Sequence, residues 1–217
     1  RLVGSGMWIR ASSRAGGGHL GMVVGEPGVG KTRMARELEG HARMRGARVA
    51  WGRCYEEQGL PPYWPWVQVV RALLRDSDPE AIRSALGTGA PEIAEIVADL
   101  RTYLPDVPPP AKVDSPQYAR FRLFESLTAY LRAVAVDRPL VILLDDLQWA
   151  DQSSLMYLEF LAAALGDSAI LLVGMYRDVG LSPQHPLVQA LGALTREPHF
   201  QRMALKGLGE DDVARLI

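Results

Sequence analysis

Residues 25–32 read GEPGVGKT, an order of glycines, lysine and threonine that suits a chain of phosphates. Glycines let backbone N–H groups approach an anion without a Cβ atom in the way. Lys31 adds a positive charge for the β- and γ-phosphates, and Thr32 offers a hydroxyl oxygen to Mg²⁺. The alternative is a chance glycine turn before a structural helix. The candidate nucleotide-binding residues are Gly25, Glu26, Pro27, Gly28, Val29, Gly30, Lys31, Thr32 and Arg33.

A phosphate loop needs a carboxylate for its metal ion, and VILLDD supplies two at the end of an apolar run. We expect Asp145 to bind Mg²⁺ through a bound water, together with Thr32, and Asp146 to orient or deprotonate the attacking water. Two adjacent carboxylates repel each other, and a nearby cation would offset this. A pair of exposed acids in a turn is the alternative.

Two arginines are weaker candidates. Arg177 ends the next apolar run, where a side chain could contact the γ-phosphate, so it joins Lys31, Asp145 and Asp146 in the predicted catalytic set. The alternative for Arg177 is a plain ion pair with Asp178. Arg196 follows a predicted helix and is interpreted as a solvated cation at a helix C-terminus rather than a residue acting on a neighbour's nucleotide.

Two further side chains of the same region are expected to support the fold rather than to bind a ligand. Asp151 is expected to cap the helix that follows it, and Trp149 is expected in the core. The four histidines are scattered along the sequence and form no candidate site.

Composition excludes several classes of protein. The 217 residues are 48% hydrophobic and 23% charged, which is typical of a globular protein, and the net charge of −1 does not favour wholesale binding to nucleic acid or to an anionic membrane. The single cysteine, Cys54, cannot form an internal disulfide, so a reducing, cytoplasmic setting is expected. No apolar run approaches the roughly 20 residues of a membrane helix.

The elements that must position these residues alternate between strands and helices. This order predicts an α/β fold with a parallel sheet covered by helices on both faces. The apolar runs predict strands at 19–24, 47–52, 139–146, 169–176 and 200–205. Helices are expected after Lys31 and at 66–75, 79–86, 91–103, 116–134, 151–165 and 183–195.

The predicted helices before residue 116 belong to an expected helical insert at about 53–115 within a core of 20–205. Three prolines in CYEEQGLPPYWPW predict a rigid loop, which we interpret as core packing, with a docking surface as the alternative. Residues 1–19 are expected to be a lead-in segment. Residues 206–217 are expected to begin a truncated lid or helical domain of a longer protein.

Four segments together resemble the AAA-type ATPase module of STAND signalling proteins: GEPGVGKTRMAREL, WGRCYEEQGLPPYWPWV, RPLVILLDDLQWADQSSLMYLEFL and YRD…HPLVQAL. The likeness is greatest to the module of large LuxR-type bacterial transcriptional regulators, and the same module occurs beside adenylate cyclase and Ser/Thr kinase domains. The loop and the paired aspartates are common to many NTPases, whereas GRCYEE…PPYWPWV with DDLQWAD is more specific.

The resemblance implies a three-layer α/β/α P-loop NTPase of the additional-strand class. It implies slow hydrolysis of ATP with Mg²⁺, binding of ATP and ADP, self-association in the ATP state, and contact with DNA only through a domain outside this chain. It also implies that the strand before Gly25 lies centrally and is separated from the strand ending at Asp145 by the strand ending near Tyr176.

The sequence departs from such modules near its first residues. They commonly open with a VGRE-like stretch, whereas Ser5 follows Val3 and Gly4 here, so the contacts to the adenine base stay open.

Two other interpretations remain open. One is a scaffold that binds ATP without hydrolysing it, although the intact Lys31, Thr32, Asp145 and Asp146 argue against it. The other is a mechanical motor that works in a ring, for which neither an arginine finger nor a pore loop is evident.

Overall fold

A computed structural model of the chain describes residues 17–56 and 59–205. The predicted lead-in therefore lies almost entirely outside the described residues, as do the predicted start of the lid domain and the departure at Ser5.

Five strands form one sheet in the order β2-β3-β4-β1-β5, and every neighbouring pair is parallel. The strands are β1 (His19–Val24), β2 (Arg48–Arg53), β3 (Leu140–Asp145), β4 (Ile170–Tyr176) and β5 (Phe200–Ala204). β4 lies between β1 and β3, which confirms the predicted separation. The middle place, however, belongs to β4, while β1 is an interior strand one place from the edge.

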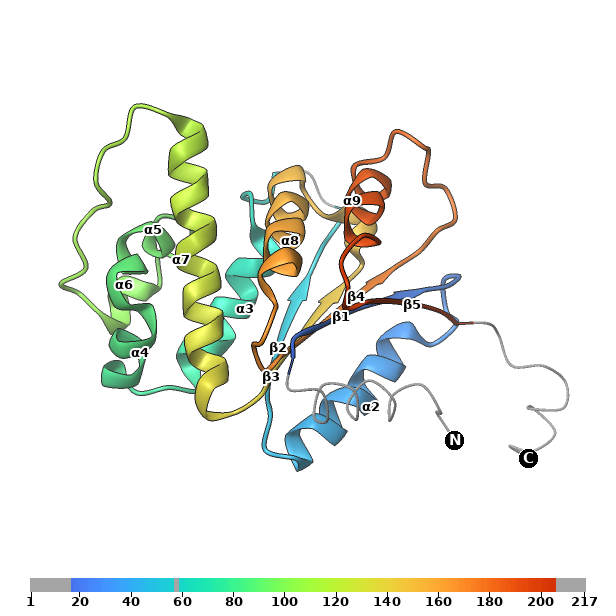
Figure 1. Cartoon of the computed structure of the whole chain (residues 1–217), viewed down its shortest axis with the longest axis horizontal. Coiled ribbons are helices and arrows are strands. Elements are labelled where there is room, and N and C mark those ends of the chain that lie inside the picture. Colours follow the sequence, from blue (N-terminus) through green and yellow to red (C-terminus); the bar gives the residue numbers. More distant parts are fainter. Residues whose placement is uncertain (1–16, 57–58, 206–217) are drawn as a thin grey trace, which may run out of the picture.

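Helices cover both faces of the sheet, so the architecture is the predicted three-layer α/β/α arrangement (Figure 1). One face carries α2 (Lys31–Met44), whose buried Met34, Ala35 and Leu38 pack with Val23 and Val141. The other face carries α3 (Trp64–Arg75), α8 (Gln152–Ala164) and α9 (Pro186–Leu194). β3 and β4 are buried along their whole length, as expected for strands covered on both sides.

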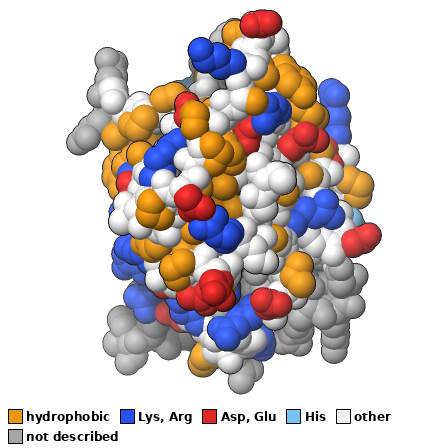
Figure 2. Space-filling model, turned by 90° about the vertical axis from the view of Figure 1, so that its left-hand side faces the viewer, with side chains coloured by type: hydrophobic (Ala, Val, Ile, Leu, Met, Phe, Trp, Pro, Cys, Tyr) orange, Lys and Arg blue, Asp and Glu red, His pale blue; other side chains and the backbone are white. Residues whose placement is uncertain are grey.

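Between β2 and β3 the chain forms a group of helices beside the sheet (Figure 1). It contains α3, α4 (Pro79–Leu86), the short 3-10 helix η1 (Gly87–Gly89), α5 (Ala90–Ile96), α6 (Leu100–Tyr103) and α7 (Pro116–Asp137). Ser115 accepts a hydrogen bond from the Tyr118 N–H and so caps α7. On the face that these helices present, acidic and basic side chains are interspersed with hydrophobic ones (Figure 2).

Several local expectations are wrong for identifiable reasons. α3 begins at Trp64, inside the proline-rich segment predicted to be a loop, because Pro65 occupies the first turn, where a helix tolerates proline. α9 begins at Pro186 rather than near residue 183, with His185 as its cap. The apolar residues of α7 suggest one buried face, but Phe121 is 45% exposed.

No helix within residues 17–56 and 59–205 is both long and apolar enough to cross a lipid bilayer.

Candidate functional site

The phosphate loop runs from the end of β1 to the start of α2. Gly28 and Gly30 have φ angles of 79° and 102°, in the left-handed region that side chains disfavour. A Cβ atom at either position would meet nothing within 4 Å, so open space faces the loop there. No side chain caps α2, which leaves the N–H groups of its first turn for an anion.

Lys31 is buried, and its Nζ donates to the carbonyl oxygens of Gly25 (2.6 Å) and Glu26 (2.9 Å). Burial lowers the pKa of the Lys31 ammonium, and the neighbouring Arg177 guanidinium lowers it further. The ammonium therefore lies within the loop that it is predicted to serve.

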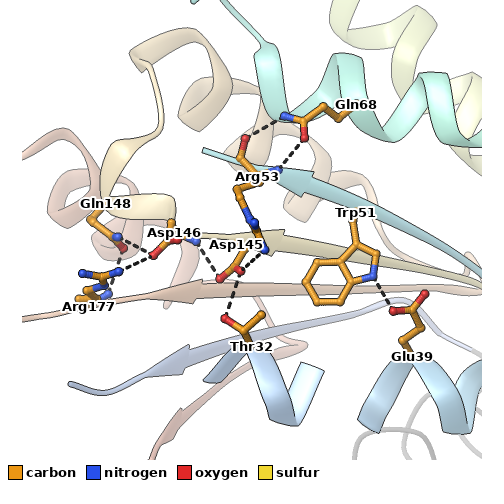
Figure 3. A network of polar contacts seen from close by, with 9 residues as sticks. All are labelled: Thr32, Glu39, Trp51, Arg53, Gln68, Asp145, Asp146, Gln148 and Arg177. Carbon is orange, nitrogen blue, oxygen red and sulfur yellow. Dashed lines mark hydrogen bonds and ion pairs between the residues drawn. The ribbon is translucent and has the colours of Figure 1, made fainter. Parts of the chain in front are cut away.

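The predicted metal-binding residues lie next to each other although they are far apart in the sequence. Asp145 is the last residue of β3 and is only 3% exposed. Its Oδ2 accepts a hydrogen bond from Thr32 Oγ1 at 3.2 Å (Figure 3). Hydroxyl and carboxylate oxygens are donors that Mg²⁺ prefers, so Thr32 and Asp145 fit the ion and would hold it. Residues 17–56 and 59–205 contain no cluster of three or more His, Cys, Asp or Glu side chains that could hold another kind of metal.

Asp146, which follows Asp145, lies outside the strand with φ 58° and ψ 43°. Its Oδ1 accepts a hydrogen bond from Gln148 Nε2 at 2.8 Å and lies 3.4 Å from Arg177 Nη2 (Figure 3). Gln148 Oε1 in turn accepts the Arg177 N–H at 3.1 Å. The ion pair of Arg177 is therefore with Asp146 and not with Asp178, the partner considered from the sequence.

Sequence reasoning missed Arg53, Gln68 and Gln148. Arg53 ends β2, and its Nη2 lies 3.3 Å from the same Asp145 oxygen that Thr32 contacts. Gln68 of α3 is hydrogen-bonded to the backbone of Arg53. Arg53 follows Trp51 and Gly52 at the end of a predicted strand, so its position beside the carboxyl edge was the available signal.

A cavity of about 780 Å³ lies beside the loop, away from the two carboxylates. It is lined by Val24, Gly25, Glu26, Pro27, Gly28, Val29, Asp178, Val179, Ala204 and Leu205. The loop thus has carboxylates on the side of β3 and a cavity on the side of β5. The volume of this cavity is typical of small-molecule sites.

The other predictions have mixed outcomes. Asp151 caps α8, as predicted, by accepting the Ser154 N–H at 3.0 Å. Trp149 is 42% exposed and so is not in the core. Arg33 is exposed on the first turn of α2, and Arg196 is exposed after α9. The aromatic side chains of the proline-rich segment differ in exposure. Trp66 is buried in the core, whereas Tyr55 is exposed.

Comparison with known proteins gives one match at the level of sequence. The profile of a family described as "AAA ATPase domain" matches residues 10–173. No curated protein matches the chain.

Solved structures give only distant similarities. A chain in the structure of Drosophila ORC bound to AT-rich DNA and Cdc6 is 10% identical with a TM-score of 0.48, over 94% of this chain and 53% of that one. VirB4 of Thermoanaerobacter pseudethanolicus is 14% identical with a TM-score of 0.41, over 90% of this chain and 79% of that one. The present chain thus spans about half the length of the first, and similarities this low carry no argument about function.

Proposed function

This chain belongs to the AAA ATPase domain family, and from that premise we propose that it is a switch that binds ATP with Mg²⁺ at residues 25–33 and hydrolyses it slowly. The observation that carries the proposal is the hydrogen bond between Thr32 and Asp145. Two segments more than 100 residues apart bring together the hydroxyl and the carboxylate that a nucleotide-bound Mg²⁺ requires, directly beside the loop.

The surroundings of the loop support the rest of the nucleotide. The phosphates would lie over Gly28 and Gly30, where no atom stands in the way, against the free N–H groups of α2. Lys31 would exchange its bonds to the Gly25 and Glu26 carbonyls for phosphate oxygens. The nucleoside would extend into the cavity on the β5 side, and Mg²⁺ would neutralise charge on the phosphate oxygens when bound.

Slow hydrolysis is supported by the ion pair between Arg177 and Asp146. Arg177 Nη2 lies 3.4 Å from Asp146 Oδ1, so the Arg177 charge is balanced by this carboxylate. Arg177 would have to leave Asp146 to contact a γ-phosphate. Without that exchange of partners, Arg177 cannot stabilise the charge that develops on the transferred phosphate.

The biological role follows from the resemblance to STAND modules. We assign the chain to a bacterial signalling protein, namely a LuxR-type transcriptional regulator in the cytoplasm, in which ATP favours self-association and DNA is contacted by another domain. A protein carrying an adenylate cyclase or Ser/Thr kinase domain is the alternative context. A scaffold that binds ATP without hydrolysing it is the alternative activity.

The test is single-turnover hydrolysis of ATP by the purified chain. We expect a rate of about 10⁻⁴–10⁻² s⁻¹, the range of phosphate-loop switches without a supplied arginine. Lys31→Ala should weaken ATP binding and slow hydrolysis, whereas Lys112→Ala, at an exposed position in the 105–114 segment, should change neither. A rate above about 1 s⁻¹ would identify an enzyme built for turnover instead. Tight binding with no detectable hydrolysis would favour the scaffold.

A further inference from the structure

The carboxylate predicted to bind the metal ion already has a cationic partner. Arg53 and Asp145 lie opposite each other in the parallel pairing of β2 with β3, at the carboxyl edge of the sheet. Arg53 Nη2 approaches Asp145 Oδ2 at 3.3 Å, and Thr32 Oγ1 donates to that same oxygen at 3.2 Å (Figure 3). The guanidinium and the metal ion would therefore compete for one oxygen atom.

The backbone of Arg53 is held in place from outside the sheet. Gln68 of α3 donates to the Arg53 carbonyl oxygen at 2.8 Å, and its Oε1 accepts the Arg53 N–H at 3.3 Å (Figure 3). One amide side chain thus satisfies both backbone groups at the end of β2. The side chain of Arg53 keeps its freedom, because 43% of its surface is exposed, compared with 4% for Asp145.

We propose that Arg53 is a positioning residue that occupies the metal side of Asp145 in the nucleotide-free site and must withdraw before Mg²⁺ binds. This inference rests on the proposed function. A buried carboxylate needs a compensating charge, and the guanidinium provides it while no metal is present. A guanidinium and a divalent cation on one oxygen repel each other, so the two states exclude each other.

The difference in exposure decides which group moves. Asp145 is fixed at the end of a fully buried strand, whereas the Arg53 side chain is already 43% exposed and can turn into water at a smaller cost. The concentration of Mg²⁺ at which ATP binds tightly would then be set by this exchange. Gln68 would keep the backbone of Arg53 in place during the exchange, so that only the side chain moves.

The experiment measures the affinity of the chain for ATP by calorimetry, once with excess Mg²⁺ and once with EDTA. Arg53→Gln removes the competitor of Mg²⁺ for the Asp145 oxygen. The ratio of the dissociation constant in EDTA to that in Mg²⁺ should therefore rise by about threefold to tenfold, as expected from the loss of one charge contact at short range. An unchanged or lower ratio would overturn the proposal.

Three variants separate this role from a structural one. Arg53→Lys keeps the charge and should return most of the wild-type ratio, and Arg48→Gln, at the opposite end of β2, should leave it unchanged. In an Asp145→Asn background, Arg53→Gln should no longer change the ratio, because its partner is gone. A change of the same size in that background would refute the mechanism.

A second readout covers the case in which substitution impairs folding. Without Mg²⁺, Arg53→Gln should lower the melting temperature, and Mg²⁺ with ADP should recover more stability than in the wild type. An equal rise in melting temperature on addition of Mg²⁺ and ADP in both proteins would contradict the proposed exchange of Arg53 for Mg²⁺. If the wild-type chain binds no ATP in either condition, the proposed function itself fails, which is distinct from tight wild-type binding with an unchanged ratio.

Discussion

Asp145 is contacted at both its carboxylate and its backbone. Thr32 and Arg53 both contact its Oδ2, the Asp146 N–H donates to its Oδ1 at 3.1 Å, and its carbonyl oxygen accepts the Cys54 N–H. Its carboxylate is therefore contacted from α2, from β2 and by the next backbone N–H before any ligand binds. The contacts from Thr32 and from the Asp146 N–H would keep the carboxylate in place while Arg53 withdraws, which reduces the rearrangement that a bound metal ion would require.

Substitutions of Lys31 and of Asp145 should both weaken ATP binding, but they should depend differently on Mg²⁺. Lys31→Ala removes a charge that faces phosphate and should weaken ATP binding with or without Mg²⁺, by about tenfold or more. Asp145→Asn should weaken binding mainly when Mg²⁺ is present. Calorimetry in Mg²⁺ and in EDTA distinguishes the two effects, and unchanged affinity for Mg-ATP in both variants would remove the site assignment.

Cys54 should be unreactive in the native state. Burial, followed by the nearby Asp151, Asp146 and Asp145, raises the pKa of the Cys54 thiol to about 12. At pH 8 it should therefore react with a thiol reagent far more slowly than the same chain in urea, which serves as the control.

The same shift gives a pH dependence of stability. A raised pKa means that the folded state keeps a proton which the unfolded state has lost. Stability should therefore fall as the pH rises above the ordinary thiol pKa of about 8.5. Equal thiol reactivity of the native and unfolded chains at pH 8 would contradict the burial of Cys54.

The contact between β2 and α3 depends on a glycine. A Cβ atom at Gly52 would lie 2.4 Å from the Pro65 carbonyl oxygen, and that backbone atom cannot give way easily. Gly52→Ala should lower the free energy of unfolding by about 1–3 kcal/mol, the usual cost of overpacking. Urea denaturation measures the change.

Gly40 offers the matched control, since it lies on the exposed side of α2, where an added Cβ atom would meet nothing within 4 Å. Gly40→Ala should raise stability by about 0.5–1 kcal/mol. If Gly52→Ala were as harmless as Gly40→Ala, the close approach of α3 to β2 would be wrong.

The elements that the sequence predicts well are those with strong apolar patterns. Uninterrupted apolar runs place β3 and β4, and a capping Ser115 followed by Pro116 marks the start of α7. The errors lie where two signals conflict. Proline predicts a loop near Trp64, but a proline in the first turn also begins a helix, and only packing against β2 decides between them.

The residues of the site also fall into a group that the sequence predicts and a group that it does not. The loop and the two aspartates are contiguous motifs, so they could be proposed from the sequence. Arg53, Gln68 and Gln148 depend on which strand lies beside β3 and on the direction of single side chains. Arg53 meets Asp145 only because β2 pairs with β3 in that register, across the helices that separate them in the chain.

ATP should change the assembly of the longer protein to which this chain is expected to belong. Arg177 and Asp146 hold each other in the ligand-free site, so a γ-phosphate that drew Arg177 away would favour a different state. Driving such an equilibrium from 1:99 to 99:1 takes about 5.5 kcal/mol of differential affinity. Contacts from Lys31 and Arg177 that exist in one state only would supply part of it.

Light scattering with ADP, ATP and a non-hydrolysable analogue measures this effect. ATP and the analogue should give the same larger species, and ADP the smaller one. Identical mass and shape in all three conditions, with turnover faster than about one per second, would favour a dedicated ATPase over a switch.

The strand order also has a consequence for synthesis on the ribosome. β1 is made before every other described strand, yet its two neighbours, β4 and β5, are the last two. At the usual speed of translation, β1 therefore waits roughly ten seconds for a strand partner. Both of its edges, which β4 and β5 cover in the finished sheet, stay open until then. β1 is therefore the segment that a chaperone would have to cover during synthesis.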